Sequence, residues 1–241
     1  MKHRKACPVC DNTARRFYAA PRDGETFYQC QACGMIYQTL VASHQEQRLW
    51  YNHEHRPSEA VEEQNRKYAH LFLEPQARGV RLLEIGSNTG AMLDEYRSMG
   101  FEVLGVEPSE ELAAVRPDLP VITGFFETAP ELDGRLFDVV ISFHVLEHVE
   151  SPVRFAKKVR RHLRRSGLWL NYMPNVETWK PANLQTWEKG QPWIHAETKH
   201  LHEHINLFSK DTAFLLCRRA GFGIFRPGFR GDDLLFYAGV A

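Results

Sequence analysis

The stretch RLLEIGSNTGAMLDEYRSMGFEVLGVEPS, residues 81–109, decides the fold of this protein. It opens with an apolar run at 81–85 that has the length and composition of a short buried strand. A glycine turn follows, and then a helical pattern that begins at Gly90 and stops at Gly100. A second apolar strand ends on an acid, Glu107. This order predicts a strand–turn–helix–strand unit of a parallel sheet.

The same alternation of strand and helix continues toward the C-terminus. The run FDVVISF at 137–143 is continuously apolar, as expected for a parallel strand buried on both faces. We therefore predict an α/β, Rossmann-like sheet of seven strands, mostly parallel, with an antiparallel last hairpin. The further expected elements are helices over 110–116, 153–165 and 210–222, and strands over 120–123, 167–174, 222–227 and 232–240.

The glycine turn indicates the kind of cofactor. Gly86 lets the backbone approach a ligand, Gly90 opens the helix, and Glu107 follows the second strand, where a carboxylate can accept both hydroxyls of a ribose. The dinucleotide fingerprint G-x-G-x-x-G is absent, because Asn88 occupies its middle glycine position. The turn therefore favours an adenosine-containing cofactor without a pyrophosphate, although these glycines could also serve tight turns of another doubly wound fold.

Four cysteines near the N-terminus have the spacing of a metal site. The pattern is C-x2-C-x19-C-x2-C, formed by Cys7, Cys10, Cys30 and Cys33. Four thiolates close a tetrahedron around Zn²⁺ and leave no open position, so we expect a structural zinc ion. Residues 1–40 show no apolar period long enough for a core, and zinc ligation would supply the missing folding energy. A redox C-x-x-C pair is the alternative interpretation.

The bulk composition is that of an ordinary globular protein. The 241 residues carry 30 basic and 30 acidic side chains, so no basic field indicates a nucleic acid partner. No long apolar run suggests a leader or a membrane span, and we expect a soluble, cytoplasmic protein. The expected organisation is a zinc-binding domain at 1–40, a linker and docking helix at 41–75, and a cofactor domain at 76–241 with an insert at 174–208. The sequence does not indicate an oligomeric state.

Several motifs together resemble one family. The segments EIGSNTGAML, VLGVEPS, GFFE and FDVVISFHVLEHV are similar to the class I S-adenosylmethionine (SAM)-dependent methyltransferases, and LHEHINLFS at 201–209 resembles a segment of the sugar C-methyltransferases of deoxysugar biosynthesis. Members of that branch also begin with a four-cysteine zinc domain. The resemblance implies the following SAM contacts: Glu84, Gly86, Ser87, Asn88, Gly90, Glu107, Phe125, Phe126 and His144. For Phe125 and Phe126, plain core packing is an equally good interpretation.

The resemblance also implies a general base. A histidine matching His204 removes a proton from the acceptor in that family, and residues matching Glu203 and His148 belong to the same site. Substrate contacts would come from Tyr51, Glu147 and His202.

Two departures weaken the implied nucleotide-sugar substrate. The family has a tyrosine where this chain has Leu201, and it carries a further C-terminal domain, whereas this sequence ends after DDLLFYAGV at 232–240. We therefore expect methyl transfer to a carbon or oxygen of a small, carbohydrate-like molecule, with O-methylation a serious competitor.

Other functions remain open at this point. Zinc knuckles and the arginines around residues 160–165 could bind RNA, although the solvated face of an amphipathic helix explains these arginines better. Glu147, His148 and histidines of the insert could hold a divalent ion. A cofactor-binding module without catalysis is the third alternative.

Overall fold

The computed structural model describes residues 2–19, 26–44, 46–48, 57–74, 79–178 and 204–240. These residues divide into two compact units. Unit 1 contains 1–42, 144–157 and 171–238, and unit 2 contains 43–143, 158–170 and 239–241. One boundary of this division falls after residue 42, close to the one expected near 40, and none falls near 75; two later segments of the chain belong to the same unit as the N-terminal one.

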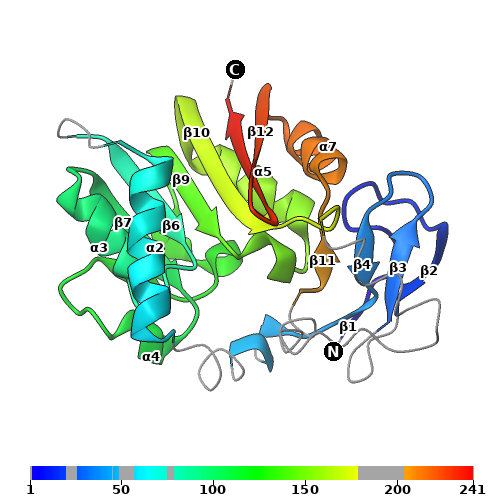
Figure 1. Ribbon diagram of the computed structural model, residues 1–241, viewed down its shortest axis with the longest axis horizontal. Helices are drawn as coiled ribbons and strands as arrows, with labels where there is room; N and C mark the ends of the chain where they lie inside the picture. Colours follow the sequence, from blue (N-terminus) through cyan, green and yellow to red (C-terminus); the bar gives the residue numbers. More distant parts are fainter. Residues whose placement is uncertain are drawn as a thin grey trace. The chain divides into compact units, whose positions relative to one another are not determined.

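The central sheet has seven strands in the order β12-β13-β10-β9-β6-β7-β8 (Figure 1). Numbered by their order in the chain, these strands run 3-2-1-4-5-7-6 from the β8 end. The sheet is thus mixed and mostly parallel, as the sequence predicted. The strands are β6 (Arg81–Ile85), β7 (Glu102–Glu107), β8 (Val121–Thr123), β9 (Phe137–Phe143), β10 (Leu163–Pro174), β12 (Ile224–Arg230) and β13 (Asp233–Gly239).

The parallel part of the sheet lies in unit 2. Strand β6 pairs in parallel with β7 on one side and with β9 on the other, so the strand order reverses there. Ligands of doubly wound sheets bind at such a switch point, outside the carboxyl ends of the strands. The glycine turn after β6 and the acid at the end of β7 therefore stand where the fold places a ligand.

Helices of unit 2 follow the predicted pattern with shorter bounds. Helix α3 (Ala91–Ser98) follows the glycine turn, and α4 (Glu110–Ala113) is only one turn long, not the seven residues expected. Helix α2 (Glu59–Phe72) lies in the segment expected to hold a docking helix and is capped by Ser58, whose side chain accepts a bond from the backbone N–H of Val61. It packs on α3 (Figure 1), and Tyr68 and Phe72 contact Phe143 of β9.

The helix expected over 153–165 ends earlier. Helix α5 (Pro152–His162) stops at His162, and β10 begins at the next residue. Arg164, which completes an amphipathic pattern in the sequence, instead bonds to Asp138 of β9 at 3.1 Å. In unit 1, α7 (Lys210–Ala220) starts at the capping Ser209 and ends at Gly221, which has the predicted left-handed conformation.

A second sheet joins the N-terminal segment to a later part of unit 1. Its order is β11-β4-β3-β2, with β2 (Arg15–Ala19), β3 (Phe27–Cys30), β4 (Ile36–Gln38) and β11 (Asn206–Leu207). Strands β1 (Lys2–His3) and β5 (Leu40–Val41) form a small separate pair. The four-stranded sheet carries a core of Phe27, Ile36, Val176 and Leu207. Two of the four members of this core come from later in the chain, so the N-terminal segment acquires a core although residues 1–40 show no apolar period long enough to form one.

The remaining described elements are short 3-10 helices: η1 (Phe126–Thr128), η2 (Pro130–Leu132) and η3 (Leu146–His148). Cys217 is fully buried in α7, where its thiol is part of the core. Within the described residues, no helix has both the length and the apolar character needed to cross a membrane.

Candidate active site

The glycine turn after β6 is shaped by left-handed backbone conformations. Gly86, Asn88 and Gly90 have φ values of 74°, 49° and 77°. Glycine adopts this conformation without a steric penalty, and asparagine tolerates it better than most residues. The N–H groups of Gly86 and Ser87 both donate to the carbonyl of Val106, at 2.8 and 3.2 Å. The turn is therefore tied to the end of the neighbouring strand β7.

Two buried carboxylates face this turn. Glu107 is 4% exposed and accepts bonds from the backbone N–H of Asn88 at 2.8 Å and of Ser109 at 2.9 Å, one on each oxygen. A carboxylate oxygen can accept more than one hydrogen bond, as binding of a ribose diol would need. Glu84 is 2% exposed, and its Oε2 has no hydrogen-bond partner within the described part of the chain. Burial, and then the charge of Glu107, raise the pKa of Glu84 well above its usual range.

The two phenylalanines expected at the adenine differ from each other. Phe126 is 2% exposed and packs against the ring of His162, with the Lys158 ammonium 5.1 Å from its centroid. Phe125 is half-buried and stacks on His44, with ring centroids 4.2 Å apart. Core packing thus accounts for Phe126, while Phe125 presents an aromatic face at the edge of unit 2.

In unit 1, a carboxylate lies among three histidines directly after the end of β9. Glu147 Oε1 lies 3.1 Å from Nδ1 of His144 and 4.0 Å from Nε2 of His204. The rings of His148 and His204 meet edge to face, with centroids 4.9 Å apart. Glu147 is 2% exposed, and its Oε2 has no hydrogen-bond partner among the described residues.

The histidines decide the charge of this carboxylate. Burial opposes ionisation of Glu147, but the hydrogen bond to His144 and the charges of His148, His144 and His204 hold its pKa at about 2. Burial also opposes protonation of His144, yet the bond to Glu147 and the charges of Glu147 and Asp233 raise its pKa. A carboxylate that stays ionised beside imidazoles makes them stronger bases, which is the pairing used in general base catalysis.

His144 itself has an unusual backbone. Its φ is 51°, in the left-handed region that non-glycine residues rarely adopt. Its backbone N–H donates to the carbonyl of Tyr172 at 2.9 Å, and the two rings meet edge to face. The Tyr172 hydroxyl in turn donates to Asp233 at 2.6 Å. Strained residues of this kind persist only where their surroundings hold them, and they cluster at functional sites.

The four cysteines of the N-terminal segment come together. Their sulfur atoms all lie within 4.8 Å of one another. The Sγ atoms of Cys7 and Cys33 are 3.6 Å apart, and those of Cys10 and Cys30 are 3.5 Å apart. Four sulfurs at 2.3 Å from one ion would be separated by about 3.8 Å, so these distances fit a tetrahedral zinc site.

The structure leaves some predicted residues untested and adds others. Tyr51, His202 and Glu203 lie outside the described residues. Polar partners that the sequence did not indicate, because each meets residues far away in the chain, are Arg4 and Asn206 in unit 1 and Glu62, Thr89 and Arg116 in unit 2. In the sequence, Arg4 stands three residues before Cys7 among other basic residues, and nothing there indicates its contact with Asn206.

A switch point with a glycine turn after the first strand, an acid after the second and a closing hairpin defines the class I methyltransferase fold. The chain belongs to the methyltransferase-domain family, whose model matches residues 52–225. The match covers the glycine turn, Glu107 and the histidine cluster up to His204, and it begins after the cysteine segment.

Relatives and solved structures agree with this membership. A ubiquinone biosynthesis O-methyltransferase from Roseobacter denitrificans is 29% identical over 162 residues, and one from Sinorhizobium medicae is 27% identical over 166. These alignments span 63% and 57% of this chain, and 64% and 66% of those proteins, slightly less than two thirds of their length.

Two solved structures have the same fold. A SAM-dependent methyltransferase from Thermotoga maritima superposes with a TM-score of 0.57 and 21% identity, over 75% of this chain and 89% of that one. The magnesium protoporphyrin IX methyltransferase of Synechocystis, with bound SAH, gives 0.60 and 11% identity, over 83% and 100%. At these identities the likeness concerns the fold alone.

Proposed function

We propose that this protein transfers the methyl group of SAM to a hydroxyl oxygen of a small molecule, with His204 as the general base. The observation that carries the proposal is the buried Glu147 carboxylate facing His204 and His148 in a chain of the methyltransferase-domain family. The names of the two relatives support oxygen as the acceptor atom. The sugar acceptor rests only on the resemblance of segment 201–209.

The residues of unit 2 fit SAM. Glu84 Oε2 is buried and has no hydrogen-bond partner among the described residues, so a cationic ligand group would satisfy it, and the carboxylate of Glu107 could accept the hydroxyls of a diol. Gly86 and Gly90 keep side chains out of the turn, and Ser87 and Asn88 lie between them. When bound, SAM supplies an electrophilic methyl group on a sulfonium. We propose that Phe125 flanks its adenine and that His144, at the end of β9, lies on the acceptor side.

The residues of unit 1 would move the proton. The acceptor hydroxyl would give its proton to a nitrogen of His204, which makes its oxygen a nucleophile for the methyl group that bound SAM would supply. Glu147 stabilises the imidazolium that forms, because its carboxylate is ionised. His148, packed edge to face on His204, holds that ring in place. The proposed roles of Glu203, His202 and Tyr51 lie outside the described residues.

We also propose that Cys7, Cys10, Cys30 and Cys33 hold a structural Zn²⁺, which the sulfur distances support. A site closed by four thiolates has no position for an acceptor, so zinc would stabilise unit 1 and take no part in the chemistry. The expected organisation changes accordingly. We propose that the zinc segment is an integral part of unit 1, because it shares the β4–β11 ladder with residues 206–207.

The experiment compares His204→Gln with the wild type. We expect SAM affinity by calorimetry to stay unchanged, while methyl transfer falls by roughly two to four orders of magnitude, as is usual for loss of a general base. The acceptor panel contains catechols and other phenols in one arm and nucleotide sugars in the other. His70→Gln is the matched control, since His70 lies on α2 and pairs with Glu95 at the surface. Full turnover in His204→Gln would remove His204 from the mechanism.

One observation favours a second mechanism. Ligand atoms of Glu147, His148 and His204 lie within 4.8 Å of one another, which is close enough for a shared divalent ion. A metal would then polarise the acceptor hydroxyl in place of the base. Activity that a chelator abolishes and that Mg²⁺ or Mn²⁺ restores, with the cysteine-bound zinc still in place by metal analysis, would establish this mechanism. Activity that is indifferent to the chelator would exclude it.

A further inference from the structure

Arg4 binds two distant parts of unit 1 at once. Its Nη2 donates to the backbone carbonyls of Val149 at 3.1 Å and Glu150 at 2.5 Å. Its Nη1 donates to the side-chain Oδ1 of Asn206 at 2.9 Å and, at longer range, to the carbonyls of Ile205 and Gln38. One guanidinium thus connects the segment that follows His148, the segment that follows His204 and the strand β4.

Asn206 completes the same arrangement from the other side. It is fully buried, and its Nδ2 donates to the carbonyl of Val149 at 2.7 Å, with longer contacts of 3.4 Å to the carbonyls of Leu146 and Glu147. The carbonyls of Leu146 and Glu147 belong to the 3-10 turn η3, which carries Glu147 and His148, and Val149 caps the end of this turn. As a member of β11, Asn206 also pairs with Tyr37 of β4 in the cysteine-rich sheet.

The two side chains therefore fix the backbone on both sides of the histidine pair. His148 directly precedes Val149, and His204 lies two residues before Asn206, so the groups that Arg4 contacts lie within two residues of both histidines. A guanidinium presents several donors in a rigid plane, and a buried carbonyl left without a donor is costly. Glu150 also forms an exposed ion pair with Lys2, which lies outside both of these segments.

We infer that Arg4 and Asn206 are positioning residues that set the separation of His148 and His204, and that the cysteine-rich segment thereby shapes the acceptor side of the active site. The inference rests on the proposed function for its catalytic meaning, but the positioning itself is independent of it. Zinc would then help to position His204 without contacting it, because Arg4 lies three residues before the zinc ligand Cys7.

The test uses the full chain with its zinc bound and the variants Arg4→Lys and Asn206→Asp. Lysine keeps the positive charge but cannot bridge two carbonyls and an amide oxygen in one plane. Aspartate keeps an acceptor for Arg4 but loses the donor to Val149, Leu146 and Glu147. Lys2→Gln is the matched control. It removes an exposed ion pair to Glu150 at a residue two positions before Arg4.

Hydrogen–deuterium exchange locates the effect without turnover. We expect exchange in peptides covering 146–150 and 204–208 to rise by roughly ten-fold in both variants, with the turn at 84–90 unchanged, since local openings report local contacts. The imidazole resonances of His148 and His204 should shift at fixed pH. Exchange that rises throughout the chain, or imidazole resonances at wild-type positions in both variants, would overturn the inference.

Catalysis supplies the second readout, with a catechol as the acceptor probe. We expect kcat to fall about 10- to 100-fold, because a displacement of about 1 Å at a reacting group has such an effect, while calorimetric SAM affinity stays within two-fold. A kcat of Arg4→Lys equal to that of the wild type would show that only the positive charge at position 4 matters and would also overturn the inference. Wild-type protein that binds SAM but methylates no probe would count against the proposed function only, because the exchange and resonance results stand without turnover.

Discussion

Glu84 and Glu107 end neighbouring strands, yet the protein surrounds them differently. Both oxygens of Glu107 accept backbone N–H bonds, whereas one oxygen of Glu84 has no partner within the described residues. The sequence could place both acids at the carboxyl edge of the sheet, because strand pattern and spacing decide that. It could not predict which acid keeps an unsatisfied oxygen, because the donors Asn88 and Ser109 depend on turn conformation.

We predict that Glu84→Gln stabilises the free protein and weakens SAM binding. The raised pKa of Glu84 means that the folded state keeps a proton that the unfolded state releases at about pH 4.3. The stability of the wild type is therefore fully present below that pH and declines as pH rises toward the folded-state pKa. Glutamine is never ionised, so the variant should melt a few degrees higher than the wild type at pH 8 but not at pH 4.

The same variant should bind SAM about ten-fold or more weakly, because a charge-assisted bond to the ligand is lost. Thermal melts at several pH values and calorimetry measure the two effects. Glu102→Gln is the control, since Glu102 lies at the opposite, exposed end of the neighbouring strand. A variant that melts at or below the wild-type temperature at pH 8 would contradict the burial argument.

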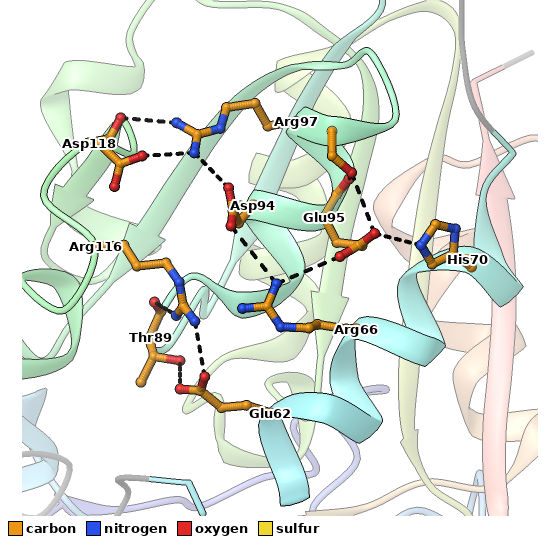
Figure 2. Close-up of polar contacts among 10 residues, drawn as sticks. Glu62, Arg66, His70, Thr89, Asp94, Glu95, Arg97, Arg116 and Asp118 are labelled. Atoms are coloured by element: carbon orange, nitrogen blue, oxygen red, sulfur yellow. Dashed lines mark hydrogen bonds and ion pairs between the residues drawn. The ribbon is translucent and has the colours of Figure 1, made fainter. Parts of the chain in front are cut away.

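Among the elements, α2 is linked by charge to the cofactor turn. Figure 2 shows Glu62, in the first turn of α2, bonded to the Thr89 hydroxyl at 2.5 Å and to Arg116 at 3.0 Å. Arg116 also donates to the Thr89 carbonyl. The bounds and cap of α2 were predictable because a capping serine and an apolar face are local features. The contact of Glu62 with Thr89 was not, because it joins residues that are 27 positions apart.

We predict that Glu62→Gln loosens the cofactor turn. The side chains of Glu62 and Arg116 are only 22% and 21% exposed, so their pair is shielded more than a surface ion pair. If loss of these contacts destabilises the SAM-binding conformation of the turn by about 1 kcal/mol, SAM affinity falls by roughly five-fold. Glu63→Gln is the matched control on the adjacent residue, since Glu63 is exposed and pairs with the exposed Lys67 of the same helix. Equal SAM affinity in the two variants would contradict the role given to Glu62.

At the scale of the whole molecule, the chain builds its two units from interleaved segments. The sequence predicted a mostly parallel sheet of seven strands, because the alternating strand and helix patterns are long enough to show a period. It missed the way in which the cysteine segment acquires its core. Strand β11 has two residues and no period, and its partner β4 lies about 170 positions away. Long-range pairing of short strands leaves no local pattern to detect.

Zinc removal tests how far unit 1 depends on its metal. The wild-type chain should contain about one zinc per molecule, as four thiolate ligands imply. Cys30→Ser should lose the metal and expose the core of Phe27, Ile36, Val176 and Leu207, because β3 carries both Phe27 and Cys30. Exchange should then rise in peptides 26–41 and 204–208 together.

Since the proposed SAM contacts at residues 84–126 belong to unit 2, the SAM affinity of Cys30→Ser should stay within a few-fold of the wild type. Methyl transfer should be lost, because His204 loses its support. Cys217→Ala, at a buried cysteine outside the cluster, should keep the zinc. Metal-free protein with wild-type exchange in both peptides would show that hydrophobic burial alone holds this segment.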